Sequence, residues 1–196
     1  ILNTLCNNLQ KFTKMNHPTW KKIFCKDALL PIGWTKDVLI EIDLTGTIIS
    51  IAPNSKKRNA QMYFDMVIPG MPNVHSHVHQ IALAGRTERA RNSNENFWGW
   101  RDMMYQFLKN VTPSDLKVFA EYAFLEMLKS GYTSVAEFHY LHHDFYGKPY
   151  SNPAEMSLAI IKAANNLGIG LTILPVLYQY SNFGGRTATE TQRRFV

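Results

Sequence analysis

Two histidines, His75 and His77, stand two residues apart, shortly after the apolar residues 66–68 and the turn pair Pro69-Gly70. Side chains two residues apart leave the same face of a strand, so both imidazoles could present a neutral nitrogen to one metal ion. Zinc takes such ligands readily. Two polar loop residues would give the same spacing, so the pair alone predicts only a candidate part of a metal site.

The elements that would position these histidines can be read from the pattern of apolar and turn residues. Residues 66–68 predict a buried strand that ends at Pro69-Gly70 and leads into the histidine pair. Further along the chain we expect helices over residues 96–108, 112–131 and 152–167, strands over residues 133–138 and 171–177, and the opening of another helix at residues 189–196. This order of strands and helices predicts a parallel sheet with helical crossovers.

In such folds the chemistry gathers where the parallel strands end. Polar residues follow each predicted strand: His75 and His77 after the first, Tyr140 with His139, His142 and His143 after the second, and Tyr178, Gln179 and Tyr180 after the third. We therefore expect these side chains to meet at one edge of the sheet.

The N-terminal part of the chain has a different composition. Residues 20–66 contain short β-branched runs separated by turn residues, which predicts a small antiparallel β unit. The chain does not begin with methionine, and Met15 opens a more orderly segment. We expect residues 1–14 to be an extraneous or disordered extension, residues 15–66 to form part of a β domain, and residues 67–196 to form the α/β domain.

Composition limits the classes of function. The 196 residues are 45% hydrophobic, enough for a sizeable core, and no apolar stretch approaches the roughly 20 residues that span a bilayer. Cys6 and Cys25 lack zinc-knuckle or redox spacing, and no signal peptide is evident, so a cytoplasmic location is the default. The net charge of +6 comes from short scattered clusters, which argues against a nucleic-acid partner and leaves a small anionic substrate open.

Four motifs resemble a known family. Residues 69–77 resemble the first-strand metal motif of the amidohydrolase superfamily, and residues 97–105, 131–143 and 174–180 are similar to its formimidoylglutamate deiminase branch. The likeness runs from about residue 23 to the last residue. It implies a (β/α)8 barrel with a small β-sandwich, of which only about three βα units are present, so we expect the chain to be the N-terminal part of a longer protein.

The resemblance also implies a reaction, the zinc-dependent hydrolysis of N-formimino-L-glutamate to N-formyl-L-glutamate and ammonia in histidine degradation. His75 and His77 would be the first two ligands of a single zinc ion. Gln80 would contact the formimino group, and Arg101 and Tyr140 would hold the carboxylates of the substrate. The chemistry of these side chains agrees, because a guanidinium binds a carboxylate at two points and a phenol is a directional donor.

Other parts of the family's site are absent from these residues. A third histidine ligand, an aspartate ligand, the acid/base histidine and another arginine are expected beyond Val196. His79 stands where the family usually has an aromatic residue, and we interpret it as a packing replacement rather than a spare ligand. Ile81 stands where an arginine is common. The resemblance allows a homodimer, but no residue of the chain predicts one.

Several alternatives remain open from the sequence. The parent protein could be another amidohydrolase that deaminates a heterocyclic ring, or the chain could be a truncated, non-catalytic product. Arg101 could instead pair with Glu95 or Asp102 at the surface. We expect His139, His142 and His143 not to be ligands, and Glu137 to have a structural rather than an acid/base role.

Overall fold

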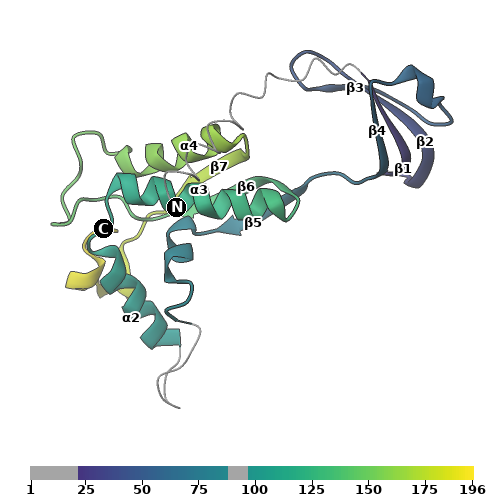
Figure 1. Cartoon of the computed structure of the whole chain (residues 1–196). Helices are drawn as coiled ribbons and strands as arrows, with labels where there is room; N and C mark the ends of the chain where they lie inside the picture. Colours follow the sequence, from purple (N-terminus) through teal and green to yellow (C-terminus); the bar gives the residue numbers. More distant parts are fainter. Residues whose placement is uncertain (1–21, 88–96) are drawn as a thin grey trace. The chain divides into compact units, whose positions relative to one another are not determined.

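The computed structural model describes residues 22–87 and 97–196 (Figure 1). The chain divides into two compact units, Ile1–Gly70 and Met71–Val196, and each is described by itself. The expected extension at residues 1–14, which includes Cys6, and the candidate start Met15 lie outside the described residues.

The first unit is a four-stranded sheet in the order β3-β2-β1-β4. Its strands are β1 (Lys22–Leu30), β2 (Gly33–Ile42), β3 (Ile48–Ala52) and β4 (Met62–Val67), with a short 3₁₀ helix η1 (Lys57–Asn59) before the last. The first three strands pair antiparallel, as predicted, whereas β4 pairs parallel to β1. A small core of Cys25, Ala28, Val38 and Ile40 covers one face.

The prediction that residues 66–68 form a buried strand leading to the histidine pair is wrong. Met66 belongs to β4 of the first sheet, and its side chain is 66% exposed. The strand that carries His75 is β5 (Met71–Ser76), which begins after Pro69-Gly70. Proline lacks the N–H that a ladder needs, and Pro72 lies at a register shift in the pairing of β5 with β6, where proline is tolerated.

The second unit has a three-stranded parallel sheet in the order β5-β6-β7, with helices in the crossovers, as predicted (Figure 1). Its further elements are η2 (Val78–Leu83), α2 (Phe97–Leu108), α3 (Pro113–Lys129), β6 (Tyr132–His139), α4 (Glu155–Leu167), β7 (Gly170–Pro175), the hairpin β8 (Tyr180–Asn182) and β9 (Arg186–Thr187), and η3 (Glu190–Gln192).

Local signals set the ends of the two crossover helices. At the start of α3 the Thr112 hydroxyl accepts the Asp115 N–H at 3.1 Å, and the Asp115 carboxylate accepts the Thr112 N–H at 2.9 Å, a reciprocal capping box. At the end of α4, Gly168 adopts a left-handed conformation with φ of +74°, which ends the helix. These caps determine where β6 and β7 begin.

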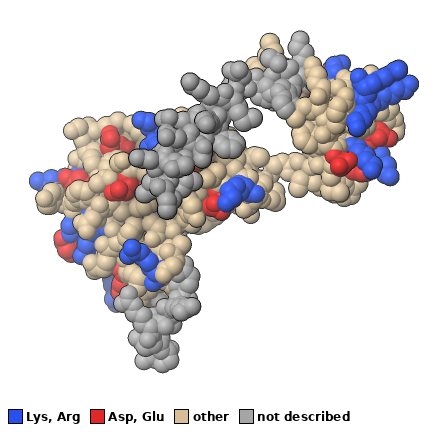
Figure 2. Space-filling view, viewed as in Figure 1, with Lys and Arg blue, Asp and Glu red and all other residues tan. Residues whose placement is uncertain are grey.

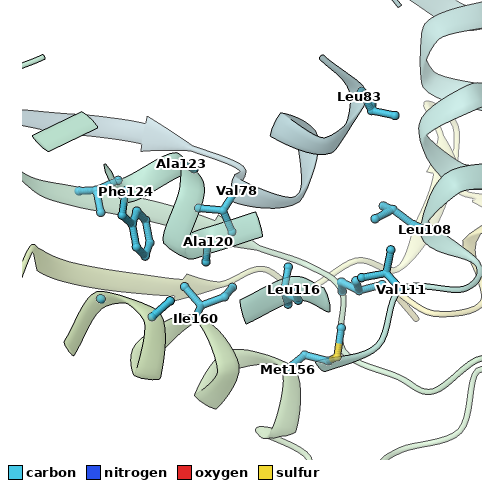
Figure 3. Close-up of a cluster of buried hydrophobic side chains, with 14 of the residues drawn as sticks. Val78, Leu83, Leu108, Val111, Leu116, Ala120, Ala123, Phe124, Met156 and Ile160 are labelled. Carbon is cyan, nitrogen blue, oxygen red and sulfur yellow. The ribbon is translucent and has the colours of Figure 1, made fainter. Parts of the chain in front are cut away.

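The core of the second unit lies where α3 and α4 pack together beside the sheet. Figure 3 shows Leu116 and Phe124 of α3 close to Met156 and Ile160 of α4, and all four side chains are fully buried. Val135 of β6 belongs to the same cluster. Because side chains alternate along a strand, the helix side of β6 also takes Glu137 and His139, and the opposite side takes Phe138.

The helix predicted to open at residues 189–196 is a single 3₁₀ turn, η3, capped by Thr189. The segment after this turn packs into the interior of the unit, and the side chains of Gln192, Arg194 and Phe195 are all buried. The Arg194 guanidinium donates to the carbonyls of Leu108 and Val111, which ties this segment to the end of α2.

Two surface properties bear on partners. In the parts of the chain that the structure describes, no helix is long and apolar enough to cross a membrane. Figure 2 shows the Lys and Arg side chains of this face in separate groups on both units, with acidic side chains close to most of them.

Candidate metal centre and substrate site

The two histidines converge on one point. His75 Nε2 and His77 Nε2 lie 3.1 Å apart, with the rings nearly perpendicular. The other nitrogen of His77, Nδ1, lies 2.9 Å from the Phe138 carbonyl at the end of β6 and must donate to it. The His75 ring stacks on the Phe138 ring at 4.5 Å. One residue of the neighbouring strand therefore orients both imidazoles.

This arrangement fits a shared metal ion. With zinc–nitrogen bonds of about 2.0–2.1 Å, two nitrogens at that separation would subtend about 100° at the metal, close to a tetrahedral angle. Zinc sites normally use three or four protein ligands. Within residues 22–87 and 97–196, no group of three or more His, Cys, Asp or Glu side chains is placed to hold a metal ion. The pair would therefore be part of a larger donor set.

The electrostatics favour the metal-binding form of His77. Burial lowers the pKa of His77, and the nearby His75 lowers it further, while the hydrogen bond to the Phe138 carbonyl acts in the opposite direction. A histidine must be neutral to coordinate a metal. His77 is therefore held in the neutral form, with its Nδ1 proton on the carbonyl side and its Nε2 lone pair facing His75.

Glu137 supports the turn that follows the histidine pair. Its side chain is fully buried, and Oε1 accepts the Val78 N–H at 2.7 Å. Burial raises the pKa of Glu137 to about 7, while hydrogen bonds from Val78 and Ser76 act to lower it. Its second oxygen has no hydrogen-bond partner. The contact to Val78 fixes the start of η2, which carries His79 and Gln80.

The structure brings Gln80 and Tyr140 together. Gln80 Nε2 donates to the Tyr140 hydroxyl at 3.4 Å, and His79 Nε2 lies 3.0 Å from the same hydroxyl. Burial raises the pKa of Tyr140 to about 12 and lowers that of His79 to about 3, so at neutral pH both side chains are uncharged. His79 is packed in the core, as predicted, and it also holds Tyr140, which sequence reasoning missed.

The guanidinium of Arg101 in α2 lies over two aromatic rings. Its Cζ atom lies 4.5 Å from the centroid of the Trp98 ring and 5.7 Å from that of Tyr105. No ion pair joins Arg101 to Asp102 in the described part of the chain, and its Nε is buried without a hydrogen-bond partner. Glu95, the other partner considered, lies outside the described residues. Among the residues that the structure describes, no carboxylate neutralises this cation.

A second polar cluster near Arg101 joins Tyr178, which the sequence placed at this edge of the sheet, to Tyr105 and Gln192, which the sequence did not indicate. The hydroxyls of Tyr105 and Tyr178 lie 2.9 Å apart, and Gln192 Nε2 donates to both, at 3.2 and 3.0 Å respectively. The Tyr178 ring in turn lies 6.1 Å from that of Tyr140. The one sequence signal was the Thr-x-x-Gln pattern that ends at Gln192, which is typical of a capping box.

The histidines that follow β6 are placed differently. His139 is fully buried, and both of its ring nitrogens lack a hydrogen-bond partner. His142 Nε2 lies 2.9 Å from the Val176 carbonyl and donates to it, which joins the segment after β6 to the segment after β7. Because its Nε2 is bonded to this carbonyl, His142 holds the two loops together.

Comparison with known proteins identifies the family. The sequence model of the amidohydrolase family matches residues 66–194, which are most of the chain. The chain belongs to the amidohydrolase family. This amidohydrolase is 49% identical over 174 residues to the formimidoylglutamate deiminase of Pseudomonas aeruginosa, with 89% of the chain and 38% of that relative covered.

Solved structures show the same fold. An amidohydrolase from Brucella melitensis is 44% identical, with a TM-score of 0.84, and the match covers 89% of this chain and 39% of that one. The atrazine chlorohydrolase of Arthrobacter aurescens TC1 complexed with zinc is 20% identical, with a TM-score of 0.65 and coverage of 89% and 39%. This amidohydrolase thus spans about two-fifths of the length of the relatives that it matches.

Proposed function

We propose that the full-length protein hydrolyses N-formimino-L-glutamate to N-formyl-L-glutamate and ammonia, a step of histidine degradation. The observation that carries this proposal is the convergence of His75 and His77 on one point beside Gln80 and Tyr140. The high identity to a formimidoylglutamate deiminase supports the substrate assignment. Because the chain spans 38% of that relative, the activity is proposed for the full-length protein.

In this proposal one zinc ion is held by His75 and His77 together with further ligands of the full-length protein. When bound, zinc would lower the pKa of a coordinated water to about 7 and so supply hydroxide at neutral pH. The arrangement would be completed by a (β/α)8 barrel with a small β-sandwich, of which these two units are parts. The zinc in the atrazine chlorohydrolase structure is a property of that protein, and it carries no argument for the metal of this chain.

The residues of this chain would bind and orient the substrate. Gln80 has an amide that can donate to or accept from an amidine-like formimino group, and its contact with Tyr140 orients it. Arg101 would bind a carboxylate through its guanidinium, whose Nε lacks a hydrogen-bond partner. Tyr140, kept protonated by burial, would donate a directional hydrogen bond to the substrate. The acid/base residue lies outside this set.

The remaining proposals concern partners and location. We propose a small dianionic substrate rather than nucleic acid as the partner of this site, because the basic side chains lie in separate groups. A cytoplasmic location and a homodimer stay predictions from the sequence. A heterocyclic substrate is not favoured, because a neutral ring gives the Arg101 guanidinium no anion to bind, and a likeness at 20% identity shows the fold alone.

A substrate panel tests the proposal. The zinc-loaded full-length protein should release ammonia from N-formimino-L-glutamate and leave guanine and a triazine unchanged. Adding a chelator should abolish the release, and restoring zinc should return it. Protein with a full complement of zinc that releases no ammonia from N-formimino-L-glutamate would overturn the assignment, and release from a ring substrate instead would support the other deaminases.

A further inference from the structure

A small cavity lies beside Arg101 in the second unit. Its volume is about 330 Å³, and its wall includes Arg101, Asp102, Tyr105, Arg186 and Gln192. Neither guanidinium forms an ion pair with a carboxylate in the described residues. Two cations against the single carboxylate of Asp102 leave the wall positive. The cavity is therefore suited to a small anion.

The amide of Gln192 is oriented without ambiguity. Its Oε1 accepts the Thr189 backbone N–H at 2.9 Å, and a backbone N–H can only donate. Its Nε2 therefore faces the two tyrosines and places one hydrogen on each hydroxyl oxygen. Gln192 is 1% exposed, so water does not compete for these bonds.

The three polar groups of this cluster have one more hydrogen to donate than the cluster has acceptors to receive. The Gln192 amide supplies two hydrogens, one for Tyr105 and one for Tyr178, and the two phenols supply one each. The contact of 2.9 Å between the phenols uses one of these two. One phenolic proton therefore has no acceptor within the cluster and must point out of it.

An anion beside Arg101 would select which tyrosine keeps the outward proton. Tyr105 lines the cavity and lies under the Arg101 guanidinium, whereas Tyr178 lines a different cavity, beside His142 and Val176. When Tyr178 donates to Tyr105, the Tyr105 oxygen accepts two bonds and its proton points into the cavity. An anion beside Arg101 would stabilise this arrangement, because it offers that proton an acceptor.

We propose that Tyr105 binds a carboxylate of the substrate together with Arg101, and that Gln192 and Tyr178 orient its proton. The proposal rests on the proposed function for the identity of the substrate. It adds a neutral donor to the cation, so that one carboxylate is bound by a guanidinium N–H and a phenolic O–H. The unpartnered Nε of Arg101 is the second donor that the same anion would satisfy.

Three conservative substitutions in the full-length protein test this assignment. Tyr105→Phe should raise the KM for N-formimino-L-glutamate about tenfold and change kcat by less than about twofold, because a hydrogen bond to a charged group is lost in both ground and transition states. Tyr178→Phe should raise KM less, since Tyr105 keeps its outward proton. Tyr150→Phe, which removes a phenol that contacts Arg194 outside the cavity, is the matched control and should leave KM unchanged.

An unchanged KM in Tyr105→Phe, or a larger rise in Tyr178→Phe than in Tyr105→Phe, would overturn the assignment. Binding of glutarate, measured by calorimetry, separates the inference from the reaction. Wild type and Tyr150→Phe should bind glutarate about tenfold more tightly than Tyr105→Phe. Tyr105-dependent glutarate binding in a protein inactive on N-formimino-L-glutamate would support the anion site and reject the proposed function. Glutarate binding that is absent, or equal in all variants, would reject the anion site.

Discussion

The Nδ1 atom of His77 lies 2.9 Å from the carbonyl oxygen of Phe138, and this one bond selects the nitrogen that faces His75. A carbonyl oxygen can only accept, so His77 carries its proton on Nδ1 and leaves the Nε2 lone pair open. Metal-binding histidines typically donate a hydrogen bond from the ring nitrogen that does not bind the metal. The end of β6 therefore prepares a ligand that belongs to β5.

Removing either imidazole should remove the metal. His75→Ala and His77→Ala in the full-length protein should each weaken zinc binding by more than about 100-fold, because even changes behind a ligand cost 10–100-fold. Zinc content after dialysis, measured by atomic emission, gives the answer. His143→Gln, at a histidine outside the converging pair, should retain its zinc. Equal zinc content in the wild type and all three variants would remove His75 and His77 from the metal centre.

Arg101 should determine affinity for the acidic substrate. Arg101→Ala should raise the KM for N-formimino-L-glutamate about 10- to 100-fold, because a charged hydrogen-bonded contact is lost. Arg101→Lys should recover only part of the lost affinity, because an ammonium keeps the positive charge but lacks the planar pair of N–H donors of a guanidinium. Arg58→Ala in the first unit is the control. If Arg101→Ala has the same KM as the wild type, Arg101 lies outside the site.

Local signals predicted much of the fold. The helix α3 was predictable because Thr112 and Asp115 cap it within four residues, and α4 because Gly168 ends it. The strand at residues 66–68 was mispredicted because a short apolar run does not reveal its partner strand. Its pairing with β1 depends on residues about 40 positions away, and the register shift that accommodates Pro72 in β5 is visible only in the folded sheet.

The candidate site divides in the same way. His75 and His77 could be named from their spacing, because the contact between them is local. The contacts of His79 with Tyr140 and of Gln192 with Tyr105 join residues 61 and 87 positions apart, so only the folded chain reveals them. In neither contact does the local sequence around one residue indicate which distant residue it will meet. The residues that orient the site were therefore less predictable than those that would do its chemistry.

Acid should destabilise the second unit through His79 and His139. Burial lowers the pKa of each from 6.5 to about 3, so below pH 6.5 the unfolded chain binds more protons than the folded chain. Between about pH 4.5 and pH 7 Glu137 acts in the opposite direction, because burial raises its pKa to about 7. The contribution of the two histidines to the free energy of unfolding should be constant above pH 6.5. Towards pH 3 it should fall by about 1.4 kcal/mol per pH unit for each histidine.

His79→Phe provides the test of this pH dependence. The substitution keeps an aromatic ring and removes one titrating group, so the slope between pH 5 and pH 6.5 should be smaller than that of the wild type by about 1.4 kcal/mol per pH unit. Urea unfolding at several pH values measures it. His142→Gln, whose wild-type side chain is hydrogen-bonded to Val176, provides a comparison at a second histidine. Identical slopes in His79→Phe and wild type would show that His79 does not carry this effect.

Two glycines with open space around them should respond to alanine in opposite directions. A Cβ added at Gly99 or at Gly168 would meet no atom within 4 Å, so steric clash is excluded at both. Gly168 has a φ of +74°, where an L-residue is strained, and Gly168→Ala should lower the free energy of unfolding by about 1–2 kcal/mol. Gly99 lies in α2, and Gly99→Ala should raise it by about 0.5 kcal/mol by restricting the unfolded chain. Urea denaturation of both variants beside the wild type decides between them, and a stabilised Gly168→Ala would contradict the left-handed end of α4.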